Sequence, residues 1–288
     1  MLKIGFIGAG TVGNALANRL SACGYSVSAV ASRTFASAQK LAQAASGCQA
    51  MNSFQDLADA VDMVFITTPD GAIGQVASQV KWRLGQSVVH CSGADSAEVL
   101  EPARAMGAQV AAFHPLQTFA SVEQAISNIP GSTFAVEAEE PLRSILKEMA
   151  SRLEGYSIDL KASDKVLYHA SAVIACNYLV TLVKLSTDLW QTFNVTRQDA
   201  VRALMPLLKG TLNNLEHVGI PNCLTGPIAR GDVGTVQKHL AALDMSAPEI
   251  ATIYRELGLE TIPIAIAKGK IDESGASALD AALRAAQR

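Results

Sequence analysis

The sequence predicts an α/β fold, a doubly wound parallel sheet, followed by a second domain that is all helical. Short apolar runs alternate with segments of helical spacing through the first half of the 288 residues. The first run leads directly into Gly8-x-Gly10-x-x-Gly13, and from about residue 160 only helical patterns follow. We therefore expect domains at residues 1–158 and 159–288.

Each expected strand is a short apolar run bounded by polar or turn residues. The strands are expected at residues 3–7, 26–31, 48–50, 62–67, 87–91 and 108–113, with further candidates at 133–136 and 156–158. Helical patterns lie between them, beginning with the segment after Gly13 and one at 34–45, and a later helix is expected at 233–243. Strands separated by helices predict a parallel sheet covered on both faces. Pro69 and Pro115 are expected to end their strands.

Composition excludes several classes of protein. Hydrophobic residues make up 49% and charged residues 17%, and the net charge is −3, so we expect a folded protein with no nucleic-acid or membrane partner. The five cysteines have no metal-ligand spacing, which favours reduced thiols, a cytoplasmic location and no metal site. The first strand begins at once, which leaves no room for a signal peptide.

The segment 170–185 is almost uniformly apolar. It is shorter than the roughly 20 apolar residues that span a bilayer, and it contains Asn177. We expect a helix buried inside the helical domain or in a dimer.

The glycine motif predicts a dinucleotide site. Gly8 permits a tight strand-to-helix turn, Gly10 leaves space for a pyrophosphate, and Gly13 lets helix and strand pack closely. Backbone N–H groups at the helix start, around Thr11 and Val12, would then face the phosphates.

The end of the second strand predicts NADP rather than NAD. An NAD site normally places an acidic residue about 20 residues after the glycines, but Ser32, Arg33 and Thr34 stand here and no acidic residue precedes Asp56. A guanidinium between two hydroxyls suits a 2′-phosphate. The alternative is that Arg33 is a solvated residue that opens the next helix.

Other strand ends should face the same ligand, because ligands bind at the carboxyl ends of parallel strands. These positions are Thr67, Thr68, Pro69, Ser92 and Gly93. Ordinary turn chemistry is the equally weighted alternative for the hydroxyl residues.

Candidate catalytic and substrate residues come from three later segments. His114 follows the strand at 108–113 and is a candidate proton donor, with Gln117 beside it as a substrate ligand. His169 and Asn177 lie on the apolar helix, about 12 Å apart along its axis, where a ligand between the domains would satisfy them. A capping histidine, a core histidine and an interhelical asparagine are the alternatives.

The third segment is the polar, glycine-broken loop at 224–232. Thr225 is a candidate substrate ligand, and Arg230 could bind a carboxylate or phosphate bidentately. Arg230 could equally pair with Asp232 or with a neighbouring subunit.

The glycine strand, Ser32-Arg33-Thr34, the segment from His114 to Phe119 and the segment from Leu224 to Asp232 together resemble a bacterial family. Its members are Rossmann-like NADP-dependent oxidoreductases with a C-terminal helical domain of unknown function. The plan also resembles pyrroline-5-carboxylate reductase, ketopantoate reductase and the β-hydroxyacid dehydrogenases. The resemblance implies an N-terminal Rossmann-type NADP-binding domain, a 6-phosphogluconate-dehydrogenase-like helical domain and a homodimer joined through those helices.

The sequence departs from some of these relatives at one position. Ketopantoate reductases and β-hydroxyacid dehydrogenases carry a catalytic lysine four residues before an asparagine, but Val173 stands four residues before Asn177. The proton would then come from His114, His169, Tyr168 or water. We expect an NADPH-dependent reductase of a small carbonyl or imine compound bound between the domains. The alternatives are a non-catalytic NADP(H) sensor and a hydride carrier between NADP and a deazaflavin.

Overall fold

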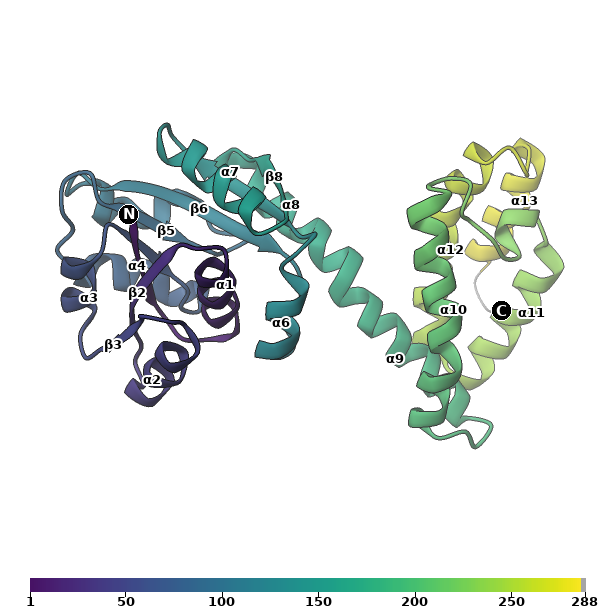
Figure 1. The fold of residues 1–288 in the computed structure, drawn as a ribbon. Helices are drawn as coiled ribbons and strands as arrows, with labels where there is room; N and C mark the ends of the chain where they lie inside the picture. Colours follow the sequence, from purple (N-terminus) through teal and green to yellow (C-terminus); the bar gives the residue numbers. More distant parts are fainter. Residues whose placement is uncertain (286–288) are drawn as a thin grey trace. The chain divides into compact units, whose positions relative to one another are not determined.

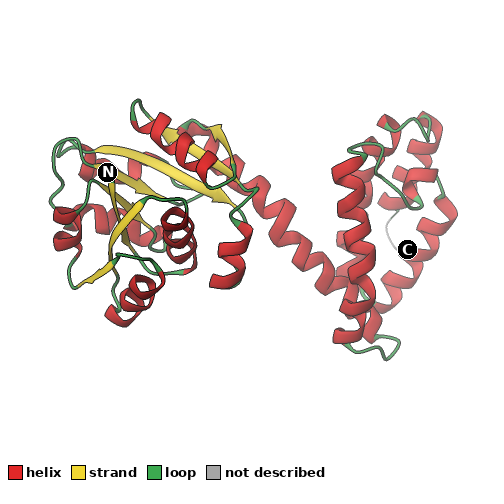
Figure 2. Ribbon diagram, viewed as in Figure 1, coloured by secondary structure: helices red, strands yellow, loops and turns green. Residues whose placement is uncertain are grey.

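The structure, a computed structural model, describes residues 1–285. It divides into two compact units, Met1–Cys176 and the residues from Asn177 onward, and each is described by itself (Figure 1). The first unit is α/β and the second is helical (Figure 2), which confirms the predicted fold class. The domain boundary after residue 158 stays a prediction; the observed division falls within a long helix, Ala162–Gln191.

The first unit is built on one eight-stranded sheet with the order β3-β2-β1-β4-β5-β6-β7-β8. Its strands are β1 (Lys3–Ile7), β2 (Ser26–Ala31), β3 (Gln49–Met51), β4 (Met63–Ile66), β5 (Ser87–His90), β6 (Gln109–Leu116), β7 (Thr133–Ala138) and β8 (Tyr156–Asp159). The strands from β1 to β6 are parallel to one another. The strand order reverses between β1 and β4, and this switch point is where open α/β sheets bind ligands.

Two predictions about β6 and β7 are wrong. The sheet is not wholly parallel, because β7 runs antiparallel to β6, so the connection through α6 (Val122–Asn128) reverses the chain instead of crossing over. Pro115 does not end its strand. β6 continues to Leu116, but β5 pairs with it only as far as Ala112. Beyond that point one side of β6 has no strand partner, and such an edge tolerates a proline without an N–H.

Each face of the sheet packs against its own set of helices. One core takes residues from α1 (Thr11–Ala22), α2 (Phe35–Ala44), α6 and α7 (Leu142–Arg152). The other takes residues from α3 (Phe54–Ala60), α4 (Asp70–Gln79), a 3-10 turn at Ala97–Leu100 and α5 (Glu101–Arg104). On the first face, Phe6, Phe65, Phe113 and Phe134 form a row of contacting rings, with centroids 5.2, 6.2 and 4.7 Å apart. All four rings are fully buried.

α8 (Lys165–Ala172) follows β8, and a π turn, Val173–Asn177, leads from it to the second unit. The helices of that unit are α9 (Tyr178–Gln191), α10 (Arg197–His217), α11 (Val233–Ser246), α12 (Pro248–Ala267) and α13 (Glu273–Arg284). Side chains such as Val236, Ile262 and Leu279 form its core. Arg255 of α12 binds Asp244 of α11 through two hydrogen bonds of 2.8 and 2.7 Å. The predicted helix at 233–243 is confirmed by α11.

Of the two settings predicted for the apolar helix, burial inside the helical domain is wrong, and burial in a dimer stays a prediction. Helix Ala162–Gln191 contains an 18-residue window of mean hydropathy 1.7, and none of that window is buried by the described residues. By length and composition alone this helix could cross a membrane. Large apolar side chains are open on α9 and α10, including Val180 at 70% exposure and Leu207 at 67%. An apolar helix is buried only where other elements pack against it. In a single copy of residues 1–285, no part of the apolar window of Ala162–Gln191 is buried in this way.

Candidate functional site

The glycine loop has the geometry that the sequence predicts. Gly8 has φ +113°, and a Cβ there would lie 2.7 Å from the carbonyl group of Thr67. A Cβ on Gly13 would lie 2.5 Å from the Gly8 oxygen and 2.6 Å from Thr67 Oγ1. Gly10, which caps α1, differs because a Cβ there would meet nothing within 4 Å. Gly8 and Gly13 therefore serve close packing, whereas Gly10 borders open space at a helix N-terminus.

Two neighbouring hydroxyls at the end of β4 have different roles. Thr67 Oγ1 donates a 2.8 Å hydrogen bond to the Gly8 oxygen, so it braces the glycine loop. Thr68 Oγ1 is buried and has no hydrogen-bond partner among the described residues. A buried hydroxyl without a partner costs free energy, so Thr68 is the one of the pair that is available to a ligand. Pro69 caps α4.

The end of β2 presents a free cation. Arg33 and Thr34 are exposed and Ser32 is half-buried. Arg33 makes no ion pair within residues 1–285, whereas most other arginines of this unit bind a carboxylate or a carbonyl. Its guanidinium is therefore available for an anion.

A buried lysine lies beyond β5. Lys165 of α8 is 1% exposed, and its Nζ donates a 3.0 Å hydrogen bond to the carbonyl oxygen of Ser92. Burial lowers the pKa of Lys165, while the carboxylate of Glu137 acts in the opposite direction. Lysine is almost never buried without a purpose or a partner, which makes this side chain a candidate for the site.

Two histidines and a tyrosine lie next to this lysine. His114 Nδ1 and the Tyr168 hydroxyl are 2.8 Å apart, and the two rings meet edge to face. The rings of His114 and His169 have centroids 6.1 Å apart. Both imidazoles crowd Gly93, because a Cβ there would lie 2.8 Å from His114 Nε2 and 2.6 Å from His169 Nδ1. Within the described part of the chain, His169 Nδ1 is buried without a hydrogen-bond partner.

Burial keeps His114 and Tyr168 uncharged. The pKa of His114 is lowered to about 4, mainly by burial and in smaller part by the nearby Lys165, His169 and His90. Burial likewise raises the pKa of Tyr168 to about 12. At neutral pH the pair is therefore a neutral imidazole and a protonated phenol, which can pass a proton between them.

His90 is a second buried histidine of the same strand ends. Its Nδ1 accepts a 3.1 Å hydrogen bond from the Ser92 N–H, and its Nε2 lies 3.1 Å from the Ser96 oxygen. Burial lowers its pKa to about 3. With both nitrogens used by the backbone, His90 shapes the turn that carries Ser92 and Gly93.

The predicted site residues fall into separate groups. His114, His169, Ser92 and Gly93 are brought together in the first unit. Gln117 is not with them, since its Nε2 lies 3.2 Å from the Asn128 oxygen and 3.3 Å from Ser132 Oγ within its own loop. The predicted residues Asn177, Thr225 and Arg230 belong to the second unit, and their part in a shared site stays a prediction.

Hydrogen bonds hold both ends of the loop at 224–232. Lys268 Nζ donates to the carbonyl oxygens of Asn222 and Leu224 at 2.8 and 2.6 Å. Asp232 caps α11 through Thr235 and makes no ion pair with Arg230 in the described chain. Thr225 lines a cavity of about 250 Å³ together with Tyr254 and Thr261.

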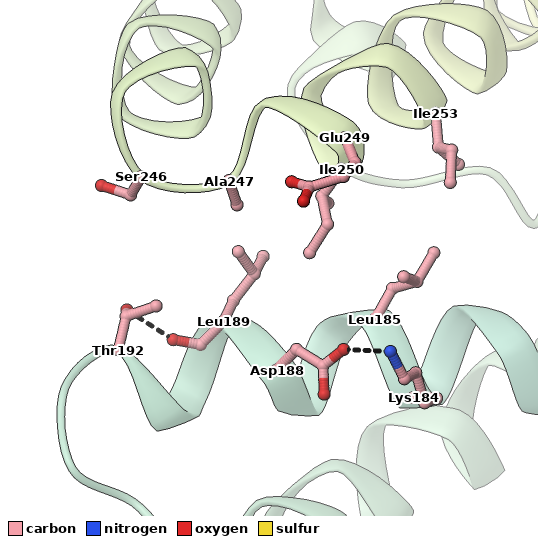
Figure 3. Close-up of a pocket in the computed structure, with 10 residues that line it drawn as sticks. All are labelled: Lys184, Leu185, Asp188, Leu189, Thr192, Ser246, Ala247, Glu249, Ile250 and Ile253. Carbon is pink, nitrogen blue, oxygen red and sulfur yellow. Dashed lines mark hydrogen bonds and ion pairs between the residues drawn. The ribbon is translucent and has the colours of Figure 1, made fainter.

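A second cavity, of about 290 Å³, lies between α9 and the start of α12. Figure 3 shows Leu185 and Leu189 facing Ile250 across it, with the Lys184–Asp188 ion pair at its edge. None of the predicted site residues lines this cavity, so it does not belong to the candidate site.

Lys165 was not among the predicted site residues, because the catalytic lysine of related enzymes was expected four residues before Asn177. Lys165, Tyr168 and His169 are spaced i, i+3 and i+4, which places them on one face of a helix. This spacing of three polar residues beside an apolar run could have identified Lys165 as a site residue from the sequence.

Two family models match the chain. Residues 3–93 match the family described as NADP oxidoreductase, coenzyme F420-dependent, and residues 132–261 match a domain of unknown function, DUF2520. The first segment holds the glycine loop, Arg33 and Gly93, and the second holds Lys165, Tyr168 and His169. No curated protein matches the chain.

Solved structures share the fold along nearly the whole chain. A protein from Bacteroides fragilis, described as a candidate NADP oxidoreductase, is 24% identical with a TM-score of 0.74, over 91% of this chain and 98% of that one. A reductive aminase from Aspergillus terreus, in complex with NADPH and ethyl levulinate, is 17% identical with a TM-score of 0.67, over 97% and 99%. A pyrroline-5-carboxylate reductase from Coxiella burnetii is 15% identical with a TM-score of 0.61, over 93% and 97%.

These matches confirm the predicted family resemblance and, at the level of the family, the predicted cofactor NADP. The identities to the solved structures are low, so those structures show the fold. The N-terminal part of the chain is therefore similar to coenzyme F420-dependent NADP oxidoreductases, and the part that follows is similar to the DUF2520 family.

Proposed function

We propose that this chain is an NADPH-dependent reductase that transfers a hydride to a small carbonyl or imine compound. The observation that carries the proposal is the contrast within the glycine loop: Gly8 and Gly13 are required by packing, whereas Gly10 faces open space at the start of α1. At a helix N-terminus that follows β1, a glycine whose Cβ would meet nothing in the protein leaves room for close approach of a ligand, here the pyrophosphate.

The residues present fit NADP. The N–H groups around Thr11 and Val12 would hold the pyrophosphate, and Arg33, with Ser32 and Thr34, would hold the 2′-phosphate. The buried and unpartnered Thr68 Oγ1 would bond to a ribose or nicotinamide group. When bound, NADPH supplies the hydride; the chain binds and orients the reactants and supplies the proton.

The proton would come from the cluster at the ends of β5 and β6. His114, Tyr168 and His169 lie there beside the buried Lys165. The alternative of a non-catalytic NADP(H) sensor was motivated by the valine at position 173. The chain does place a buried lysine, Lys165, one helical turn from Tyr168 and His169. The valine at position 173 therefore no longer favours a sensor over a reductase.

We propose a cytoplasmic homodimer, formed through the exposed apolar faces of α9 and α10. The open side chains, such as Val180 and Leu207, form a surface that a soluble monomer rarely leaves uncovered. A membrane span is disfavoured because Lys165 and Tyr168 of the same helix bond to Ser92 and His114, and because Lys184 and Asp188 interrupt the remainder. The cysteines of the described chain are free, as expected for a reducing compartment.

Calorimetric titration with NADPH and NADH, followed by NADPH oxidation with a panel of oxoacids, ketones and cyclic imines, tests the function. We expect NADPH to bind at least tenfold more tightly than NADH and at least one compound to be turned over. Absence of NADPH binding by folded protein would refute the reductase. Tight binding with no turnover would favour the sensor, and oxidation of NADPH only with a deazaflavin would favour the hydride carrier. Sedimentation of a 288-residue monomer would refute the dimer.

A further inference from the structure

Two imidazole nitrogens, His114 Nε2 and His169 Nδ1, converge above the Cα of Gly93. The position that a Cβ of residue 93 would take lies 2.8 Å from His114 Nε2 and 2.6 Å from His169 Nδ1. Both distances are shorter than a Cβ tolerates, so the two nitrogens lie close to each other over the bare Cα of Gly93. His169 Nδ1 is buried and finds no partner in residues 1–285. A polar atom of a ligand just beyond the Gly93 Cα would satisfy both nitrogens.

Tyr168 determines which ring nitrogen of His114 carries the proton. A phenol is a stronger hydrogen-bond donor than a neutral imidazole, and an imidazole nitrogen is a stronger acceptor than a phenol oxygen. The Tyr168 hydroxyl therefore donates to His114 Nδ1 across their 2.8 Å contact, and the single proton of the neutral ring stays on Nε2. His114 thus offers an N–H donor above Gly93.

The electrostatic surroundings favour negative charge at the same point. Burial is the main cause of the lowered pKa of His114. Lys165 of α8 lowers it further, as a positive charge does, and His169 and His90 act in the same direction. A protonated imine is a cation without a lone pair on nitrogen, so it would face an N–H donor and a lysine. A carbonyl oxygen accepts hydrogen bonds and becomes an alkoxide during reduction, which this environment stabilises.

We propose that His114 and His169 bind the oxygen of a carbonyl substrate, so that the chain reduces a ketone or an aldehyde to an alcohol rather than an imine to an amine. This inference rests on the proposed NADPH-dependent reductase and specifies its substrate class. It differs from the imine chemistry named for several structural neighbours, among them an imine reductase from Aspergillus terreus.

The protons and electrons of the step balance. Hydride adds to the carbonyl carbon, the π pair of the C=O bond becomes a lone pair on oxygen, and NADPH becomes NADP⁺. The alkoxide takes the proton from His114 Nε2, and His114 Nδ1 takes the phenol proton of Tyr168. His114 stays neutral through this transfer. The Tyr168 phenolate, a weaker base than an alkoxide, then takes its proton back from His114 Nδ1 while a solvent proton returns to His114 Nε2, which restores the starting tautomer.

The first experiment does not depend on turnover. Protein labelled with ¹⁵N-histidine is studied by NMR, and His114→Gln and His169→Gln identify the signals. We expect His114 to be the neutral Nε2–H tautomer at pH 7 and to remain neutral to about pH 5, in line with its lowered pKa. An imidazolium, or the Nδ1–H tautomer, at pH 7 would overturn the proposal.

The second experiment compares substrates on the holoenzyme with NADPH. Small ketones, aldehydes and oxoacids are tested against cyclic imines of matched size, such as cyclopentanone against 1-pyrroline. We expect turnover of carbonyl compounds, lowered about 100-fold by His114→Gln or His169→Gln, with NADPH affinity within about twofold of wild type. His239→Gln is the matched control, because His239 pairs with Tyr254 in the same edge-to-face manner at 3.0 Å but lies in the helical unit.

Faster turnover of imines than of carbonyl compounds would overturn the inference and leave the reductase standing. Failure to bind NADPH would refute the reductase itself, so the two failures are distinguishable.

Discussion

Two alanine substitutions in the glycine loop should separate packing from cofactor binding. In Gly13→Ala the new Cβ would lie 2.5 Å from the Gly8 oxygen and 2.6 Å from Thr67 Oγ1. Overpacking of this kind costs roughly 1–3 kcal/mol. Loss of the hydrogen bond from Thr67 to Gly8 adds about 1 kcal/mol, and the better helix propensity of alanine returns about 1 kcal/mol. The free energy of unfolding should fall by roughly 1–3 kcal/mol, which lowers Tm by roughly 3–10 °C.

In Gly10→Ala the new Cβ meets nothing within 4 Å. The weaker helix cap costs about 1 kcal/mol at most, and the stiffer unfolded chain returns about 0.4–1 kcal/mol, so stability should change little. The methyl group instead occupies the space of the pyrophosphate. Loss of one or two hydrogen bonds to a charged group, roughly 1.5–3 kcal/mol, should weaken NADPH binding by about 10- to 150-fold.

Urea unfolding and NADPH calorimetry on both variants provide the assay. We expect a crossed pattern, in which Gly13→Ala is the less stable protein and Gly10→Ala is a stable protein that binds NADPH poorly. If Gly10→Ala bound NADPH as tightly as wild type, the glycine loop would not be the pyrophosphate site. Wild-type stability in Gly13→Ala would show that the loop can relax around a Cβ.

Three further outcomes are expected. Arg33→Ala should lose about 10- to 100-fold in NADPH affinity and nothing in NADH affinity, because only NADPH carries the 2′-phosphate; an equal loss for both coenzymes would contradict this role. His90 stays neutral down to a pKa of about 3 when folded but takes up a proton near 6.5 when unfolded, so stability should fall as pH falls through this window, by up to about 1.4 kcal/mol per unit. In His90→Gln the slope of unfolding free energy against pH between 6 and 4 should be shallower, and an unchanged slope would speak against a buried neutral His90. Phe134→Ala should cost about 3–5 kcal/mol in urea unfolding, while the 72% exposed Tyr156 should tolerate alanine; equal effects would refute the aromatic row as a core.

The sequence was sufficient for features that local chemistry dictates. The glycine loop, the run of parallel strands from β1 to β6 and the position of Arg33 after β2 follow from periodicity and from the backbone needs of single residues. The change to helices in the second half was equally readable. These features depend on residues that are close together in the sequence, so the local sequence pattern is enough to predict them.

Features that depend on distant partners were decided by the tertiary structure. The reversal of β7 follows from how α6 returns the chain, and the exposure of the apolar helix follows from what a single chain leaves uncovered. Lys165 reads in the sequence as a flanking charge. It becomes a buried group only because α8 places it against the carbonyl of Ser92, and His114 and His169 converge only because the strand end carrying Gly93 lies between them. Sequence spacing fixes which residues share an element, whereas burial and convergence are properties of elements packed against one another.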